Sequence, residues 1–134
     1  MADHTRGLLD TSVVIDLDQI DAAQLPSELA ISALTLAELA AGPHAADNAE
    51  ERARRQDRLQ RVEVVFDSLP FDADAARAYG RIFAAVAAGG RKPRGPRAVD
   101  LLIAATAVAN DLPLYTRNPD DLRLLDGLIE IVAI

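Results

Sequence analysis

Short apolar runs alternate with segments of helical periodicity along this chain of 134 residues, and this alternation restricts the fold more than any other feature. We expect strands at 7–9, 29–32, 64–66, 113–115 and 129–132, although the run at 29–32 could also lead into a helix. Strands that alternate with helices favour a parallel sheet that is covered on both faces. The sequence therefore predicts an α/β fold in which a small parallel β-sheet is flanked by helices on both faces.

Helices are expected between the strands in the first half of the chain. One begins at 12–17 and is capped by Thr11 or Ser12, and another ends before the Gly42-Pro43 dipeptide. A third covers 45–61, where an acid precedes an arginine by four residues in the pairs Glu50–Arg54, Glu51–Arg55 and Asp57–Arg61. Such pairs indicate a helix that is largely exposed to solvent.

The second half of the chain continues the alternation. Asp72 should cap a helix that stops at Gly89-Gly90 and buries a face at helical spacing, made of Ala76, Tyr79, Phe83 and Val86. A very apolar helix follows at 98–110. Asn118 should cap a last short helix that has Pro119 at its first position.

The composition limits the class of protein and the kind of chemistry. Length and a hydrophobic content of 50% suit one domain over residues 1–134, with 1–6 as a flexible N-terminal tail. No apolar run is long enough to span a bilayer and no signal peptide is visible, so we expect a soluble, cytoplasmic protein without a membrane partner. The chain has no cysteine, and its two histidines, His4 and His44, belong to no cluster. Chemistry must therefore rely on carboxylates, hydroxyls and arginines.

The charge distribution is uneven. The net charge of −7 argues against a nucleic-acid partner, but the segment 91–97, RKPRGPR, is entirely basic among its charged residues. Its cations, Arg91, Lys92, Arg94 and Arg97, could contact RNA phosphates, or they could belong to an ordinary solvated loop. Because the chain has few aromatic residues and no tryptophan, we expect contacts to phosphates rather than to stacked bases.

Isolated acids in apolar surroundings are the main functional signal. Asp10, Glu38 and Asp100 are each the only charged residue of an apolar run, and Asp121 follows the strand expected at 113–115. An ionised acid that is buried without a partner costs several kcal/mol or more, so three such acids need a common explanation. A site for divalent cations would supply one, and ligands that are all oxygen favour Mg²⁺ or Mn²⁺.

Each acid also has a structural interpretation. Thr35 and Glu38 have the spacing of a capping box, and Asp121 falls in the first turn after the Asn118 cap. Asp10 could be a turn acid at the end of a strand. Asp100 is the hardest to explain in this way, because the residues around it make its helix apolar on nearly all sides. We also expect Asp100 to lie in the first turn after Pro96, where the helix N-terminus favours a negative charge.

The segments LLDTSVVID, LTLAELAAG and VDLLIAATAVANDLPLYTRNPDDL together resemble the PIN-domain family, and within it the VapC-type toxin ribonucleases of VapBC toxin–antitoxin systems. The resemblance runs from Leu8 to the C-terminus. It implies a PIN-like fold and a Mg²⁺- or Mn²⁺-dependent endoribonuclease that acts as a toxin. It also implies a homodimer and a cognate VapB-type antitoxin that covers the active site.

Residue by residue, the resemblance assigns catalytic and metal-binding roles to Asp10, Glu38, Asp100 and Asp121. It assigns supporting roles, in which a side chain orients the ligands, to Thr11, Ser12, Thr116 and Asn118. The chain departs from the family pattern at Leu122, where phenylalanine is usual, and in its long basic loop before Asp100. Because of the long basic loop, the resemblance does not indicate which RNA is the substrate.

Two other enzyme-like or signalling folds begin with a similar strand and acid but fit this sequence less well. A haloacid-dehalogenase-type phosphatase needs a second aspartate two residues after the first, where this chain has Ser12. A receiver domain needs adjacent acids after its first strand and a lysine after a late strand, but Lys92 lies in the basic segment. The main alternative from another class is a non-catalytic PIN-like protein that binds RNA or an antitoxin without cleaving RNA.

Overall fold

A computed structural model describes residues 5–90 and 96–134 of the chain, and the side chains of 96 and 97 are not described. The side chains of the four cations that could contact RNA phosphates, at 91, 92, 94 and 97, therefore lie outside the described part of the structure, and this alternative is not tested. No helix within the described ranges is long and apolar enough to cross a membrane.

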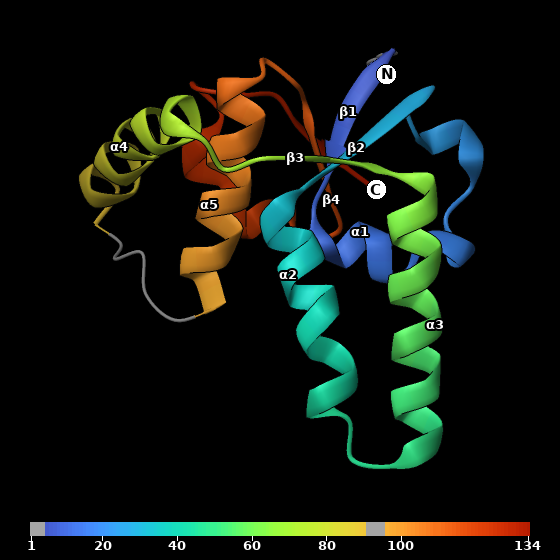
Figure 1. The fold of residues 1–134 in the computed structure, drawn as a ribbon. Coiled ribbons are helices and arrows are strands. Elements are labelled where there is room, and N and C mark those ends of the chain that lie inside the picture. Colours follow the sequence, from blue (N-terminus) through green and yellow to red (C-terminus); the bar gives the residue numbers. More distant parts are fainter. Residues whose placement is uncertain (1–4, 91–95) are drawn as a thin grey trace.

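All strands of the central sheet run parallel, as the sequence predicted. They are β1 (Arg6–Leu9), β2 (Glu28–Ser32), β3 (Asp67–Leu69), β4 (Leu114–Thr116) and β5 (Ile131–Ala133). Their order across the sheet is β3-β2-β1-β4-β5, so the chain adds strands on one side of β1 and then returns to its other side (Figure 1). The point where the direction reverses lies between β1 and β4.

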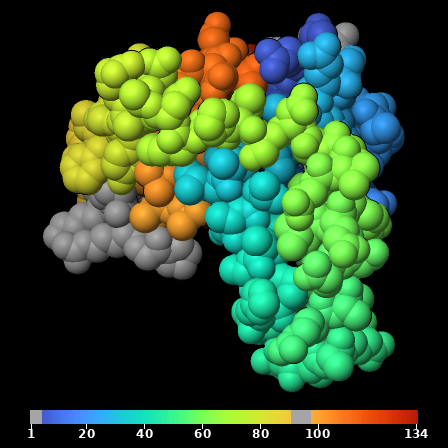
Figure 2. All heavy atoms as spheres, in the orientation of Figure 1, coloured from blue at the N-terminus to red at the C-terminus, as the bar shows by residue number. Residues whose placement is uncertain are grey.

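The helices are α1 (Thr11–Ile15), α2 (Ala33–Ala41), α3 (Ala49–Val65), α4 (Ala73–Ala88) and α5 (Pro96–Ala109). Short 3₁₀ helices cover Leu17–Gln19, Ala22–Gln24, Gly42–Ala45 and Pro119–Leu125. α2 and α3 lie side by side and form an arm that extends away from the sheet, which is clear in the space-filling view of Figure 2.

Two hydrophobic cores lie on the two faces of the sheet because successive strand residues point to opposite sides. Leu8 and Leu114 belong to the core that contains α4 and α5. Leu9, Ile31 and Tyr115 belong to the second core, which contains residues of α1, α2 and α3. This arrangement confirms that helices flank both faces.

The strand expected at 64–66 is wrong. α3 continues through Val65, and β3 begins only at Asp67. Val64 and Val65 are 86% and 69% exposed, and only Phe66 of this run is buried. A short apolar run does not by itself distinguish a strand from the last turn of a helix, and here the helix prevails.

The buried face of α4 agrees with the expected one at Val86, and Tyr79 is partly buried against the core, but Ala76 and Phe83 are exposed. Ala75, Ala78, Ile82 and Val86 are buried, whereas Phe83 is 48% exposed. We had placed the buried face at the two aromatic residues, Tyr79 and Phe83, but most of the fully buried residues lie about one position before them. The alanines instead face inward, where their small side chains allow α4 to pack closely on α5.

Several helix ends agree with the sequence. Asp72 caps α4 through a 3.0 Å hydrogen bond from the Ala75 N–H, and Gly89 and Gly90 follow its last residue. The expected ion pairs of α3 are present, at 3.5 Å for Glu50–Arg54, 3.1 Å for Glu51–Arg55 and 3.4 Å for Asp57–Arg61. α3 begins at Ala49 rather than 45, and Asn48 caps it.

The N-terminal boundary also differs from our expectation. Arg6, which we placed in the flexible tail, is the first residue of β1 and pairs with Glu28 of β2 at 3.2 Å. Thr5 accepts a 2.8 Å hydrogen bond from the Glu28 N–H.

Candidate active site

Polar residues collect where the central strands end. Asp10 directly follows β1, Ser32 ends β2 and Thr116 ends β4. Ligands of parallel α/β proteins bind beyond the carboxyl ends of the strands, at the point where the strand order reverses. Asp10 and Thr116 flank this point, since β1 and β4 are neighbours in the sheet.

Asp10 is a buried acid, only 7% exposed. Its Oδ1 accepts hydrogen bonds from the Ser12 hydroxyl at 2.5 Å and the Val13 N–H at 3.2 Å. Asp10 is therefore the cap of α1, and the expectation that Thr11 or Ser12 caps this helix is wrong. Its other oxygen, Oδ2, has no hydrogen-bond partner among the described residues.

Glu38 is tied to α1 through Thr11. The Thr11 hydroxyl donates a 2.6 Å hydrogen bond to Glu38 Oε1 and lies 3.1 Å from the hydroxyl of Thr35, which is fully buried. The capping-box interpretation of Thr35 and Glu38 is wrong, because Ser32 caps α2 and accepts a 3.0 Å hydrogen bond from the Leu34 N–H. Glu38 is exposed, so the expectation that it is a core acid is also wrong.

Asp100 lies on α5 and is partly buried. Because this helix begins at Pro96, Asp100 belongs to its second turn, and no acid occupies the first turn. The helix N-terminus therefore favours its charge less than we expected, since that effect fades within the first turn. Residues 101 and 103–107 of the same helix are buried, which confirms its apolar character.

Asp121 lies on the exposed surface of the 3₁₀ helix Pro119–Leu125, and its N–H donates a 3.3 Å hydrogen bond to the Asn118 carbonyl. The Asn118 side chain forms no capping hydrogen bond, contrary to our expectation. Instead, the Asn118 N–H donates a 3.0 Å hydrogen bond to the hydroxyl of Thr116, which is fully buried.

Ser12 connects Asp10 to the turn that carries Asp121. Its hydroxyl donates to Asp10 and accepts a 3.3 Å hydrogen bond from the Arg117 N–H. The adjacent residue, Thr11, connects to Glu38. The dipeptide after Asp10 thus links β1 to α2 on one side and to the end of β4 on the other.

The carboxylates do not form a preassembled cage. Within residues 5–90 and 96–134, no three acidic or histidine side chains are close enough to hold one metal ion together. The donors nevertheless suit a hard cation: they are oxygens, and the buried Asp10 has one carboxylate oxygen without a protein partner.

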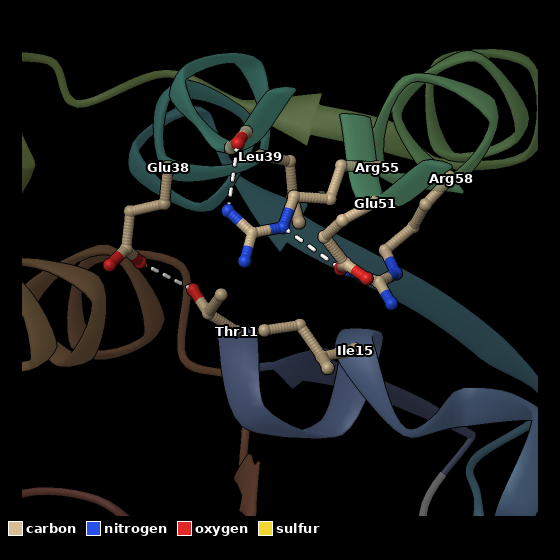
Figure 3. Close-up of a pocket in the computed structure, with 8 residues that line it drawn as sticks. Thr11, Ile15, Glu38, Leu39, Glu51, Arg55 and Arg58 are labelled. Carbon is tan, nitrogen blue, oxygen red and sulfur yellow. Dashed lines mark hydrogen bonds and ion pairs between the residues drawn. The ribbon is translucent and has the colours of Figure 1, made fainter. Parts of the chain in front are cut away.

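A pocket of about 400 Å³ adjoins this edge between α1 and the α2–α3 arm (Figure 3). Thr11 and Glu38 line one side, and Glu51, Arg55 and Arg58 of α3 line the other. Hydrogen bonds from Arg54, and then from Arg55, lower the pKa of the Glu51 carboxyl. Arg58 was not among the predicted site residues, although the sequence carries a signal for it: no acid lies three or four residues from it in either direction.

The fold and the site together define a parallel α/β protein with an acidic, all-oxygen site at the reversal point of its sheet. A family model described as PIN domain matches residues 7–128, and the chain belongs to the PIN domain family. This membership confirms the family resemblance and excludes the phosphatase and receiver alternatives. PIN-domain nucleases are in general metal-dependent.

The chain is similar to named proteins over most of its length. It is 40% identical over 133 residues to Ribonuclease VapC5 of Mycobacterium tuberculosis. This match covers 96% of this chain and 95% of that protein. It is 37% identical over 102 residues to Ribonuclease VapC8 of the same species, which covers 75% of this chain and 89% of that protein.

A solved structure is similar as well. In the crystal structure of VapBC-5 from Mycobacterium tuberculosis, described as a member of the VapBC family of toxin–antitoxin systems, one chain matches with a TM-score of 0.84 and 40% identity. The match covers 97% of this chain and 99% of that one. The PIN-like fold is thereby confirmed.

Proposed function

We propose that this protein is the toxin of a type II toxin–antitoxin system, an endoribonuclease that hydrolyses RNA phosphodiester bonds with the help of Mg²⁺ or Mn²⁺. The observation that carries this proposal is the similarity to Ribonuclease VapC5 over nearly the whole of both chains. The position of Asp10 at the reversal point of the sheet supports it independently.

Asp10, Glu38, Asp100 and Asp121 are the proposed catalytic and metal-binding residues. Asp10 supplies a buried carboxylate oxygen that no described residue uses, and Glu38 has an exposed side chain on the neighbouring helix. Bound there, a divalent cation would polarise the phosphodiester and activate the attacking water. The oxygen donors favour Mg²⁺ or Mn²⁺ over softer metals.

The neighbouring polar residues keep the acids in place. Ser12 holds one oxygen of Asp10 and leaves the other for a ligand, while Thr11 holds Glu38 beside α1. Thr116 fixes the backbone of Asn118, from which the turn to Asp121 begins. Because Thr11 and Ser12 are anchored in the fold, Glu38 and Asp10 have less freedom to lose when a metal binds.

The proposed partners are an RNA substrate, a cognate VapB-type antitoxin and a second copy of the chain. The antitoxin is supported by the VapBC-5 complex, in which the similar chain occurs. A non-catalytic protein that binds RNA or an antitoxin is the second candidate. It is favoured by one observation, that the described acids are not already gathered around a common metal position.

Asp10→Asn separates the two candidates. In the ribonuclease, this substitution should abolish cleavage and largely preserve RNA binding, because it removes a metal ligand and leaves the rest of the surface unchanged. Mg²⁺ or Mn²⁺ should raise the melting temperature of the parent protein, since a ligand that binds only the folded state stabilises it. The same metal should leave the melting temperature of Asp10→Asn nearly unchanged.

Asp121 and Asp120 provide a matched pair for the ligand assignment. Both are exposed acids of the same turn, and only Asp121 is a proposed metal ligand. Asp121→Asn should lose cleavage and Asp120→Asn should retain it. Equal activity of the two variants would remove Asp121 from the proposed site.

A further inference from the structure

The pocket beside Glu38 is lined by acids and arginines from different elements. Thr11 and Glu38 bring it to the edge of the proposed active site, while Arg55 and Arg58 extend into it from α3 (Figure 3). None of the described residues that line it is aromatic. The pocket therefore suits a charged group rather than a stacked base.

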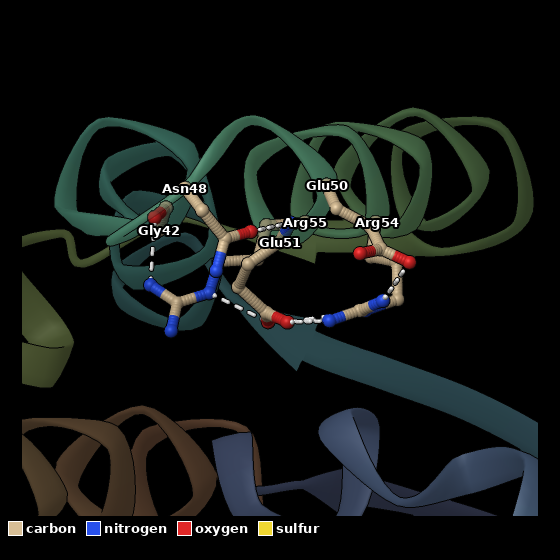
Figure 4. A network of polar contacts seen from close by, with 6 residues as sticks. All are labelled: Gly42, Asn48, Glu50, Glu51, Arg54 and Arg55. Carbon is tan, nitrogen blue, oxygen red and sulfur yellow. Dashed lines mark hydrogen bonds and ion pairs between the residues drawn. The ribbon is translucent and has the colours of Figure 1, made fainter.

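Arg55 is held in a fixed position. Its Nε donates a 3.1 Å hydrogen bond to Glu51 Oε1, and its Nη1 donates a 2.9 Å hydrogen bond to the Gly42 carbonyl (Figure 4). Nη2 donates to no described residue. The guanidinium, which is planar, thus keeps donors available and loses little conformational entropy when an anion binds.

Arg58 has an unusual environment for an arginine of α3. Arg54 and Arg61 form ion pairs with acids of this helix, at 3.5 Å to Glu50 and 3.4 Å to Asp57. Arg58 is half-buried, yet it makes no hydrogen bond or ion pair with any described residue. Its guanidinium therefore keeps donors that no described residue uses and that could bind an anion from outside the protein.

The surrounding charge explains why such a site is needed. The chain carries a net charge of −7, and the proposed catalytic residues are all acids. An RNA strand that reaches Glu38 continues past the bond to be cleaved, and its next phosphate would meet further negative charge without nearby cations. Arg55 and Arg58 place two guanidinium groups in the pocket that Glu38 lines.

We propose that Arg55 and Arg58 bind a backbone phosphate of the RNA substrate, on one side of the phosphodiester that is cleaved. This inference rests on the proposed function, because it takes RNA as the ligand. Glu51 acts as a positioning residue that holds Arg55, and Arg58 supplies donors that no described residue uses. Because Glu38 of the proposed active site lines the same pocket, a phosphate of the bound substrate is favoured over an acidic segment of the antitoxin.

The test compares arginines of the same helix. Arg58→Gln and Arg55→Gln are measured against Arg52→Gln, because Arg52 is exposed and does not line the pocket. Binding of a fluorescein-labelled, mixed-sequence single-stranded RNA is followed by anisotropy over a series of salt concentrations. The Asp10→Asn background with Mg²⁺ is used to prevent cleavage of the probe.

We expect Arg58→Gln to weaken binding roughly tenfold, as is typical for the loss of a hydrogen bond to a charged group. The slope of log K against log salt should fall by about 0.7 for each phosphate contact that is lost. Arg58→Lys should restore most of the slope but only part of the affinity, since it keeps the charge and loses the two-pronged geometry. Arg52→Gln should leave both quantities unchanged.

Equal losses in Arg58→Gln and Arg52→Gln would overturn this inference, and cleavage of total RNA by the parent protein would still uphold the proposed function. Conversely, Arg58-dependent RNA binding by a parent protein that never cleaves RNA would uphold the phosphate contact, and it would overturn both the enzyme and the position of that phosphate beside a cleaved bond. Normal RNA binding by the pocket variants, with weaker binding of the antitoxin, would assign the pocket to the protein partner and overturn the inference. Failure of the parent to bind RNA at all would overturn both.

Discussion

Ser12→Ala tests whether the dipeptide after Asp10 organises the site. The substitution removes the 2.5 Å hydrogen bond to Asp10 Oδ1 and the acceptor of the Arg117 N–H. The Asp10 carboxylate would keep only the longer, 3.2 Å hydrogen bond from the Val13 N–H. Both stability and activity should therefore fall.

The size of the effect follows from the geometry. A 2.5 Å contact is at the short end of hydrogen bonds from hydroxyls to carboxylates, and Asp10 is only 7% exposed. Loss of a hydrogen bond to a charged group costs about 2 kcal/mol. The exposed Arg117 N–H adds little to this cost, because water can replace the hydroxyl. For a domain of this length, the melting temperature should fall by about 7 °C.

Differential scanning calorimetry of the metal-free protein measures this change directly. Ser27→Ala is the control, because Ser27 is exposed and makes no hydrogen bond through its side chain in the described part of the chain. Its melting temperature should stay within about 1 °C of the parent, as expected for a surface substitution. If Ser12→Ala has the same melting temperature as the Ser27→Ala control and cleaves RNA as fast as the parent, the role assigned to Ser12 is refuted.

Two further predictions concern packing and pH. Gly7→Ala should destabilise the protein by about 2 kcal/mol through overpacking, because its Cβ would lie 2.5 Å from a ring carbon of the buried Tyr115. Gly80→Ala meets no atom within 4 Å and should stabilise α4 by about 0.8 kcal/mol. Hydrogen bonds from Arg54 and Arg55 lower the pKa of Glu51, so its ionised form stabilises the fold at neutral pH. The difference in melting temperature between the parent and Glu51→Gln should therefore shrink as the pH falls from the ordinary glutamate range through this lowered pKa.

These predictions have separate refutations in thermal melts. If Gly7→Ala and Gly80→Ala change the melting temperature by the same amount, an alanine side chain at position 7 does not clash with the Tyr115 ring. If the difference in melting temperature between the parent and Glu51→Gln does not change with pH, the ionised Glu51 carboxylate does not stabilise the fold through Arg54 and Arg55.

The sequence was informative about the fold where local pattern and tertiary packing agree. The parallel sheet, the Asp72 cap and the ion pairs of α3 were all predicted. The error at 64–66 arose because residues at the end of a helix can be apolar and exposed together. The shifted face of α4 arose because close packing on α5 selects alanines over larger aromatic residues.

The candidate site was predicted in part. A lone acid in an apolar run correctly indicated burial for Asp10. The same argument failed for Glu38, because its neighbours Leu36 and Leu39 pack into the core while its own side chain is exposed beside α1, where Thr11 contacts it. That Thr11 bonds to Glu38 and Ser12 to Arg117 could not be read from the sequence, since both contacts depend on how α1, α2 and β4 meet in space.

Cleavage of RNA by the purified, antitoxin-free protein tests the central claim most directly. Total RNA is incubated with the protein and Mg²⁺ or Mn²⁺, beside reactions with EDTA and with Asp100→Asn. We predict discrete fragments that disappear in both controls, and their mapped ends would identify the RNA and the cleaved sequence. Intact RNA with either metal, in the presence of folded protein that still binds RNA, would contradict the ribonuclease and support the non-catalytic alternative.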